Sequence, residues 1–279
     1  MDSSLGDRMK AYEMAEAGRK LMPLLPVVAR LDGRCFSKLT ATLNKPYDKR
    51  LANLMIATTK FLTQETNANC GYTQSDEITL GWSGLVLEMF FGGRIQKITS
   101  TLSAMASVFF NKKLPEYFGG DAGWMSVNSI PTFDCRVWNL PNIEEATNAF
   151  LWRELDATKN AINGAASCYY RHGDLMNKSC AEKQEMLFKK GVNFNDFPAY
   201  FKRGTYIQKK EVLRKFSAKE LDVLPKNHEA RKNSDLLVKR SEFVQLYPPP
   251  LTKVINRSDV IFFGKEPIVE SEDIKEVLS

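Results

Sequence analysis

The chain has 279 residues, of which 43% are hydrophobic, enough to build a buried core. No run of about eighteen apolar residues occurs and no basic stretch leads into a long apolar one, which excludes a membrane-spanning segment and a secretory signal. We therefore expect a soluble, cytoplasmic protein without membrane contact. Five cysteines without a Cys-x-x-Cys pair argue against a zinc site or a disulfide framework, and two histidines give poor support for a Ser-His or Cys-His triad.

The first elements in chain order are a short helix and a buried strand. A helix is expected over Leu5 to Arg19, followed by an apolar, partly β-branched run from Val27 to Leu31 that ends at Asp32-Gly33. Gly33 lets the backbone turn closely around whatever Asp32 binds. Asp32 is thus predicted at a strand end, facing a cleft.

A helix and a second strand follow. Apolar residues recur at helical spacing between Asn44 and Asn67, and the next strand, Ile78 to Trp82, is preceded by Ser75-Asp76-Glu77. A β-α-β-β unit of this kind is half of a ferredoxin-like fold and places Asp32 and Asp76 side by side at one sheet edge. Taken singly, Asp-Gly is most often a turn and Ser-Asp-Glu a loop or a helix cap.

Paired carboxylates at such an edge are how a two-metal nucleotidyl-transfer site is built. Mg²⁺ takes one or two carboxylates together with carbonyl, water and phosphate oxygens, so Asp32 and Asp76 are enough to hold it. The turn from Asp32 to Ser37 offers successive amides, and the cation of Arg34, to triphosphate oxygens. Arg94 and Lys97 lie one helical turn apart at the start of a helix predicted over residues 94–113, a place that also favours anions; the alternative is a solvated helix face.

The second half carries the positive charge. Residues 202–242 contain twelve Lys or Arg against six Asp or Glu, so this stretch accounts for the whole formal net charge of +6. It is either a surface for a phosphate backbone or a charged amphipathic helical region that packs on its own core. Beyond Pro248-Pro249-Pro250, a strand is expected over Val254 to Phe263 and a helix over Ile268 to Leu278. Five nearby aromatic residues are expected in the core: Phe194, Phe197, Tyr200, Phe201 and Tyr206.

Several strings, in this order and spacing, resemble the tRNA-His guanylyltransferase family over roughly the first three quarters of the chain. Separately none is specific. They are Arg30-Leu-Asp-Gly-Arg34, Lys45-Pro-Tyr-Asp-Lys-Arg50, Ser75-Asp-Glu77, Phe133-Asp-Cys-Arg-Val137, Trp152-Arg153 and the segment Lys183 to Thr205.

The resemblance implies a mixed α/β (α+β) fold with a ferredoxin-like polymerase palm, formed by an antiparallel sheet with helices on one face. Residues 1–140 would form this catalytic core. Residues 141–279 would be a mostly helical, basic region that completes the palm and contacts RNA and oligomer partners. Family members assemble as tetramers, so a homotetramer is expected.

The implied activity is addition of nucleotides to the 5′ end of tRNA, in the 3′ to 5′ direction, after ATP or GTP activates the 5′ phosphate. Two Mg²⁺ ions would be held by Asp32, Asp76 and the Gly33 carbonyl, with Glu77 as a further catalytic residue. Nucleoside triphosphates would contact Asp32, Gly33, Arg34, Cys35, Phe36, Ser37, Lys45, Asp48, Ser75, Asp76, Arg94 and Lys97. Of these, Asp48 is also interpreted as half of a capping pair with Arg50. RNA would contact Lys202, Arg203, Lys209 and Lys210.

One stretch departs from the family. Members dedicated to tRNA-His carry His-Ile-Asn-Asn-Leu-Tyr-Asn where this chain has Thr158-Lys-Asn-Ala-Ile-Asn-Gly164, and Ser37 stands where eukaryotic members commonly have His. The pattern is similar to the guanylyltransferase-like branch, whose members prefer templated repair of 5′-truncated tRNA. The alternatives are a tRNA-His-specific guanylyltransferase adding G at position −1, a palm-type nucleotide cyclase and a non-catalytic RNA-binding relative.

Overall fold

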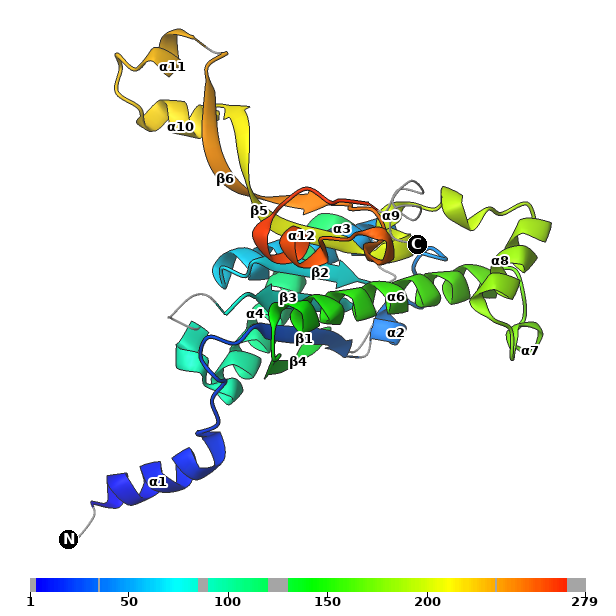
Figure 1. Cartoon of the computed structure of the whole chain (residues 1–279), viewed down its shortest axis with the longest axis horizontal. Helices are drawn as coiled ribbons and strands as arrows, with labels where there is room; N and C mark the ends of the chain where they lie inside the picture. Colours follow the sequence, from blue (N-terminus) through cyan, green and yellow to red (C-terminus); the bar gives the residue numbers. More distant parts are fainter. Residues whose placement is uncertain (1–3, 35, 85–89, 120–129, 234, 270–279) are drawn as a thin grey trace, which may run out of the picture.

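The molecule is built on one six-stranded antiparallel sheet with strand order β4-β1-β3-β2-β5-β6. The computed structural model describes residues 4–34, 36–84, 90–119, 130–233 and 235–269. Figure 1 shows the sheet at the centre of the body, between layers of helices. The strands are β1 Val27–Arg34, β2 Cys70–Gln74, β3 Glu77–Trp82, β4 Thr132–Asn139, β5 Thr205–Lys215 and β6 Leu237–Leu246.

The first four strands, with helices α3 (Lys49–Glu65) and α4 (Ile95–Phe118), form the ferredoxin-like unit. The alternate β1 residues Val27, Ala29 and Leu31 are buried against this helical layer, which contributes Leu54 and Leu102. The predicted mixed α/β fold, with an antiparallel sheet, is confirmed. The short helices α2 (Phe36–Thr40) and η1 (Phe90–Gly93) flank this layer.

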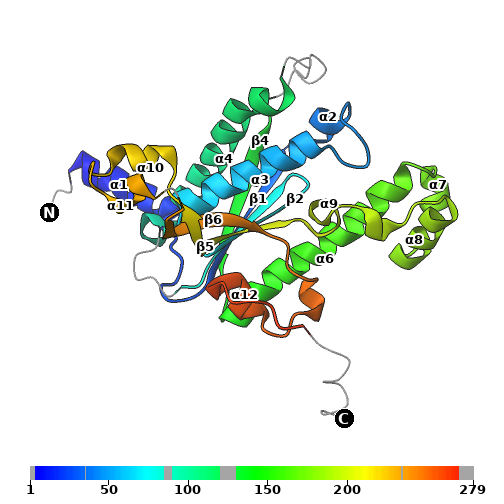
Figure 2. The ribbon, with the colours of Figure 1, turned by 90° about the horizontal axis from the view of Figure 1, so that it is seen from above.

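Helices also cover the opposite face of the sheet, which differs from the expected single helical layer. Helices α6 (Ile143–Ser167) and α12 (Arg257–Phe263) lie there, and Figure 2 shows α3 and α4 on one side of the strands and α6 on the other. The reason is visible in β1 and β3. Val28 is fully buried on this second face, and a Cβ on Gly81 would lie 2.8 Å from the ring of Phe150 in α6.

The chain after α6 forms short helices, which pack near the C-terminal end of α6. These are α7 (His172–Leu175), α8 (Cys180–Lys189), η2 (Phe194–Asp196) and α9 (Ala199–Arg203). Rings of this region meet the first half of the chain, since Tyr47 and Phe201 have ring centroids 4.9 Å apart. The expectation that these aromatic residues belong to the core is confirmed for four of them: Phe194 and Tyr206 are buried, and Phe197 and Phe201 pack against buried clusters. Tyr200 is instead half-buried at the wall of a cavity.

The C-terminal elements differ from expectation. The strand predicted over Val254 to Phe263 is wrong, because η3 (Leu251–Lys253) leads into α12, whose Val260, Ile261 and Phe262 are buried. A short apolar run does not distinguish a buried strand from a buried helix. The helix predicted over Ile268 to Leu278 lies almost wholly outside the described residues.

Strands β5 and β6 form a long hairpin that leaves the body of the molecule. They pair from Tyr206 with Leu246 to Lys215 with Leu237, and Figure 1 shows the outer part rising from the body with α10 (Ala218–Val223) and α11 (Glu229–Lys232) at its tip. The basic segment is therefore mainly a hairpin, and the alternative of a helical region is wrong. Because β5 pairs with β2, residues beyond 140 extend the palm sheet, and the predicted domain division there stays a prediction.

Helix α1 (Leu5–Ala17) projects from the other end of the molecule and buries none of its residues (Figure 1). No helix among the described residues is long and apolar enough to cross a membrane.

Candidate active site

The two aspartates predicted to share a sheet edge do so. In the β1–β3 ladder Asp32 lies opposite Glu77, and the Gly33 amide donates a 3.0 Å hydrogen bond to the carbonyl of Asp76. The turn between β2 and β3 holds Ser75 with φ at 49°, which turns the chain sharply before Asp76. The end of β1 and the β2–β3 turn thus bring Asp32 and Asp76 together.

Gly33 has no room for a side chain. A Cβ at this position would lie 2.5 Å from the ring of Phe36 and 2.9 Å from the Cβ of Asp76. Any larger residue would push the β2–β3 turn away from β1. The glycine inferred from sequence to allow close approach is therefore what lets the second aspartate sit beside the first.

The environment of Asp76 disfavours its negative charge. Burial raises the pKa of Asp76, the hydrogen bond from Ser75 opposes that rise, and the nearby charge of Asp32 adds to it. Two close carboxylates that repel one another form a site suited to a cation. The donor set, two carboxylates with the Gly33 carbonyl beside them, is what a hard ion such as Mg²⁺ takes when phosphate oxygens complete its shell. In the described part of the chain no group of three His, Cys, Asp or Glu residues could hold a metal.

Glu77, predicted as catalytic, is engaged by two arginines. The residue is 6% exposed, and its carboxylate accepts a 2.5 Å hydrogen bond from Nε of Arg153 in α6 and lies 3.9 Å from Nε of Arg30. Burial raises the pKa of Glu77 and the bond from Arg153 opposes it. The ion pair fixes the start of β3, next to Asp76. A direct catalytic part for Glu77 stays a prediction.

A cavity of about 230 Å³ opens beside this edge. Its wall includes Gln74 at the end of β2, Ser75 from the β2–β3 turn, Lys45 from the loop before α3, and Asn160 and Gly164 from α6. The last two belong to the stretch that departs from the family motif. Polar groups from three separate elements therefore converge on one cavity beside the aspartates.

Asp48 also lines this cavity but its carboxylate is committed to the helix start. It caps α3 by accepting a 2.8 Å bond from the Arg50 amide, and it forms an ion pair of 2.8 Å with the Arg50 side chain. The bond from Arg50 is the main cause that lowers the pKa of Asp48 to about 2. The capping interpretation is confirmed, whereas nucleotide contact by Asp48 stays a prediction.

The other loop residues predicted to contact nucleotide differ in exposure and in hydrogen bonding. Arg34 and Ser37 are exposed at the end of β1 and the start of α2, while Lys45 donates a 2.9 Å bond to the Thr40 carbonyl. Phe36 is 2% exposed and packs against Phe110, so its side chain belongs to the core, and its nucleotide contact stays a prediction. Cys35 lies outside the described residues.

Arg94 and Lys97 lie at the opposite end of the sheet within this chain. The α4 amide of Ile95 bonds the Arg19 carbonyl, and Ile98 packs beside Val27 and Trp82, the β1–β3 pair farthest from Asp32. Five residue steps along β1 amount to roughly 17 Å. Within a single chain, Arg94 and Lys97 are therefore far from the aspartates. Their contact with nucleotide stays a prediction.

The predicted RNA-binding residues have different surroundings. Lys202 donates to the Asn195 carbonyl, and Lys210 forms a 2.8 Å ion pair with Glu266. Arg203 ends α9 just before the strand residue Thr205, which pairs with β2 near the active-site edge. Lys209 is exposed and has no ion pair or hydrogen-bonded side-chain partner among the described residues.

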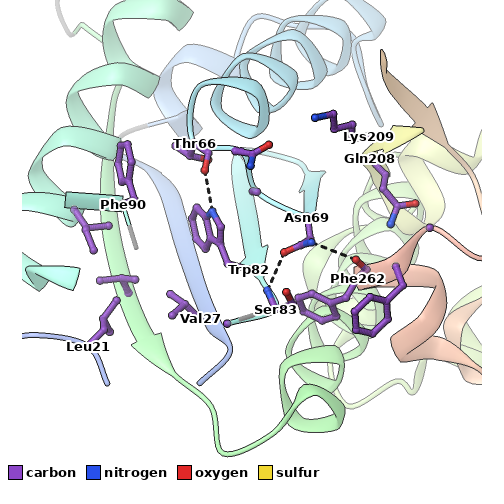
Figure 3. Close-up of a pocket in the computed structure, with 17 residues that line it drawn as sticks. Leu21, Val27, Thr66, Asn69, Trp82, Ser83, Phe90, Gln208, Lys209 and Phe262 are labelled. Atoms are coloured by element: carbon purple, nitrogen blue, oxygen red, sulfur yellow. Dashed lines mark hydrogen bonds between the residues drawn. The ribbon is translucent and has the colours of Figure 1, made fainter. Parts of the chain in front are cut away.

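A larger cavity, of about 400 Å³, lies at the other end of the sheet (Figure 3). Several of its polar groups bond one another: the Trp82 indole donates to the Thr66 carbonyl at 3.0 Å, and the Asn69 amide bridges Ser83 and Phe262. It contains neither aspartate and is lined mainly by apolar side chains. Size alone therefore does not identify the active site here.

Sequence reasoning missed the arginine cluster around Glu77. Arg153 is separated from Glu77 by 76 positions, and only the fold brings them together. The one available signal was the Trp152-Arg153 pair of the family resemblance, which gives no partner for either side chain.

The chain is similar to known proteins in sequence and in fold. A family model described as tRNAHis guanylyltransferase matches residues 6–141. A tRNA(His) guanylyltransferase of Neurospora crassa is 29% identical over 221 residues, covering 74% of this chain and 73% of that protein.

Two solved structures are also similar. A bacterial tRNA(His) guanylyltransferase-like protein in complex with ATP is 36% identical, with a TM-score of 0.66 over 74% of this chain and 87% of the other. A bacterial protein of the same description in complex with GTP is 30% identical, with a TM-score of 0.68 over 90% and 95% of the two chains.

Proposed function

The chain belongs to the tRNA(His) guanylyltransferase family of nucleotidyltransferases that act on tRNA, and from this membership we propose that it repairs 5′-truncated tRNAs by template-dependent nucleotide addition in the 3′ to 5′ direction. The observation that carries the proposal is the meeting of Asp32 and Asp76 at one sheet edge. The 3.0 Å bond between Gly33 and Asp76 holds them there, beside the 230 Å³ cavity.

The proposed reaction has two steps. A tRNA 5′-phosphate oxygen attacks the α-phosphorus of ATP or GTP, forming a phosphoanhydride and releasing pyrophosphate. The 3′-hydroxyl of a nucleoside triphosphate then attacks the activated 5′ phosphorus, forming a phosphodiester and releasing the nucleoside monophosphate. Both steps displace a phosphate-bearing leaving group in line, so positioning and charge stabilisation supply the catalysis.

Residues of this chain are suited to both tasks. Asp32, Asp76 and the Gly33 carbonyl would hold Mg²⁺, which when bound lowers the pKa of the attacking hydroxyl and offsets charge on the leaving group. Arg34 and the backbone amides of the following turn would bind triphosphate oxygens. Ser75 and Lys45, on the cavity wall, would hold the nucleotide in position.

The cavity wall supports repair over a reaction restricted to tRNA-His. Asn160, Ala161 and Gly164 line the cavity next to Ser75, in place of the motif carried by dedicated family members. A Cβ on Gly164 would meet nothing within 4 Å, so this wall is open where the motif has asparagine. The solved structures at 36% and 30% identity are described as guanylyltransferase-like, which also favours this branch.

The test is incubation with Mg²⁺, four nucleoside triphosphates and two 5′-labelled RNAs: intact tRNA-His, and a non-His tRNA that lacks its first nucleotide. Preferential extension of the truncated tRNA, ending where the template strand ends, is the expected result. Extension of intact tRNA-His alone would overturn repair and identify a tRNA-His-specific guanylyltransferase. No extension of either RNA, with cyclic nucleotide released instead, would favour a palm-type cyclase.

A further inference from the structure

An exposed tryptophan stands beside the active site, held by two arginines. Trp152, in α6, has its ring centroid 4.4 Å from the guanidinium carbon of Arg153 and 5.4 Å from that of Arg30. Cation–π contacts of this kind favour a fixed ring position. The indole is nevertheless 50% exposed, unlike the fully buried Phe150 two residues earlier.

The position of this indole relative to the aspartates follows from the sheet. Arg30 precedes Asp32 by two residues in β1, so the two side chains share one face of the sheet, with Cα atoms about 7 Å apart. Glu77, opposite Asp32, is bonded to Arg153 on the same face. Trp152, Arg30 and the Arg153–Glu77 pair thus form one cluster that adjoins the catalytic edge.

Arg30 has bonding capacity that the described protein does not use. Its Nε atom is buried without a hydrogen-bond partner, and its nearest carboxylate, Glu77, is 3.9 Å away. Its side chain remains 22% exposed. A half-exposed indole beside a partly exposed arginine is the combination that binds a base by stacking and its phosphate by charge.

We propose that Trp152 is the stacking platform for the terminal base of the RNA substrate, with Arg30 bound to the phosphate next to it. This inference rests on the proposed function, since it places the end of the RNA chain beside the aspartates. The platform binds RNA ends of any sequence, because every base has a face that stacks on an indole.

The first test is steady-state kinetics of Trp152→Ala on a truncated tRNA. Loss of one stacked base should raise the KM for RNA by about 5- to 100-fold, with little change in the KM for GTP. Trp152→Phe keeps an aromatic face and should recover most of the affinity. Tyr169→Ala is the matched control, because Tyr169 is 47% exposed just past the far end of α6.

The second test observes stacking directly. A truncated tRNA with 2-aminopurine as its terminal base is bound to saturating enzyme, so that all RNA is in the complex. Wild-type protein and Tyr169→Ala should quench the 2-aminopurine fluorescence, and Trp152→Ala should leave it bright. If Trp152 only supported Arg153, its removal would not alter the fluorescence of bound RNA at equal occupancy.

The outcomes separate the two proposals. Unchanged KM for RNA together with unchanged quenching in Trp152→Ala would overturn the platform while leaving the repair activity in place. Equal rises in the KM for RNA and for GTP, with normal quenching, would identify Trp152 as a support for the Arg153–Glu77 pair and would also overturn the platform. Absence of any extension by the wild-type chain would refute the proposed function itself.

Discussion

At the scale of single residues, Asp32 and Asp76 are the groups on which both chemical steps depend. Asp32→Ala or Asp76→Ala should lower the rates of 5′ activation and of nucleotide addition by about 1000-fold or more, because metal-ion charge stabilisation supplies several kcal/mol. The fold should survive, since neither carboxylate has a basic partner among the described residues. Single-turnover assays with 5′-labelled tRNA and a thermal melt measure the two properties. Near-normal turnover by either variant would contradict the two-metal assignment.

Asp48 provides a pH-dependent test at the same scale. Its folded pKa of about 2 lies below the ordinary value of 3.8, so its charge stabilises the folded state above pH 4, and this contribution is lost as the pH falls through 2. Asp48→Asn should therefore lower the free energy of unfolding by about 2 kcal/mol at pH 7 and by much less near pH 2.5. Urea titrations at both pH values measure the difference.

The matched control is Asp222→Asn, which alters an exposed carboxylate and should cost little at either pH. An Asp48→Asn deficit that is equally large at both pH values would show that lost packing or cap geometry, not the charge of Asp48, is responsible.

The sequence predicts the positions of the two aspartates but not the ion pair that lies next to them. Asp32 and Asp76 each end or precede an apolar run, and local pattern is enough to place such residues at strand ends. The pairing of Glu77 with Arg153 depends on how α6 crosses the sheet. No local pattern encodes that crossing, so the buried ion pair of Glu77, which the sequence predicts only as a catalytic residue, is visible in the fold alone.

At the scale of elements, the Arg153–Glu77 pair joins α6 to β3. Arg153→Met removes one partner of a pair in which both side chains are less than 10% exposed, and leaves the buried Glu77 carboxylate with only the 3.9 Å contact to Arg30. The free energy of unfolding should fall by about 3–5 kcal/mol, and Glu77→Gln in the same chain should restore part of it. Lys178→Ala breaks an exposed pair with Glu182 and should cost less than about 1 kcal/mol. Urea denaturation measures both losses. An equal fall in the free energy of unfolding for Arg153→Met and Lys178→Ala would contradict this account.

The elements of the palm were predictable because each has strong local periodicity and the β-α-β-β order limits their arrangement. The second helical layer was not predictable, because α6 is amphipathic like α3. The sequence of α6 does not indicate which face of the sheet it covers. The sequence predicts a strand in place of α12 because seven residues are too few to show a helical period.

At the scale of the whole molecule, the positive charge is less available than composition implies. On the hairpin, Arg214 and Arg240 both bond Glu220, while Lys215 pairs with Asp235 and Lys239 with Glu211. Sequence counts charges but does not show which of them are paired across strands. The twelve Lys and Arg residues of 202–242 therefore overstate the number of unpaired cations there.

Lys209 is the hairpin lysine whose removal should affect tRNA binding most directly. It is exposed at the base of the hairpin without an ion-pair partner among the described residues, whereas Lys239 pairs with Glu211 farther out. If the Lys209 ammonium contacts a phosphate, Lys209→Ala should weaken tRNA binding at low salt and reduce the slope of log affinity against log salt by about 0.7–0.9. Lys239→Ala, measured beside it in the same filter-binding series, should change the slope much less, because its charge is already neutralised. An unchanged slope in Lys209→Ala would place the RNA path away from this part of the hairpin, and would leave the Arg203 end of β5, near the aspartates, as the basic contact to test.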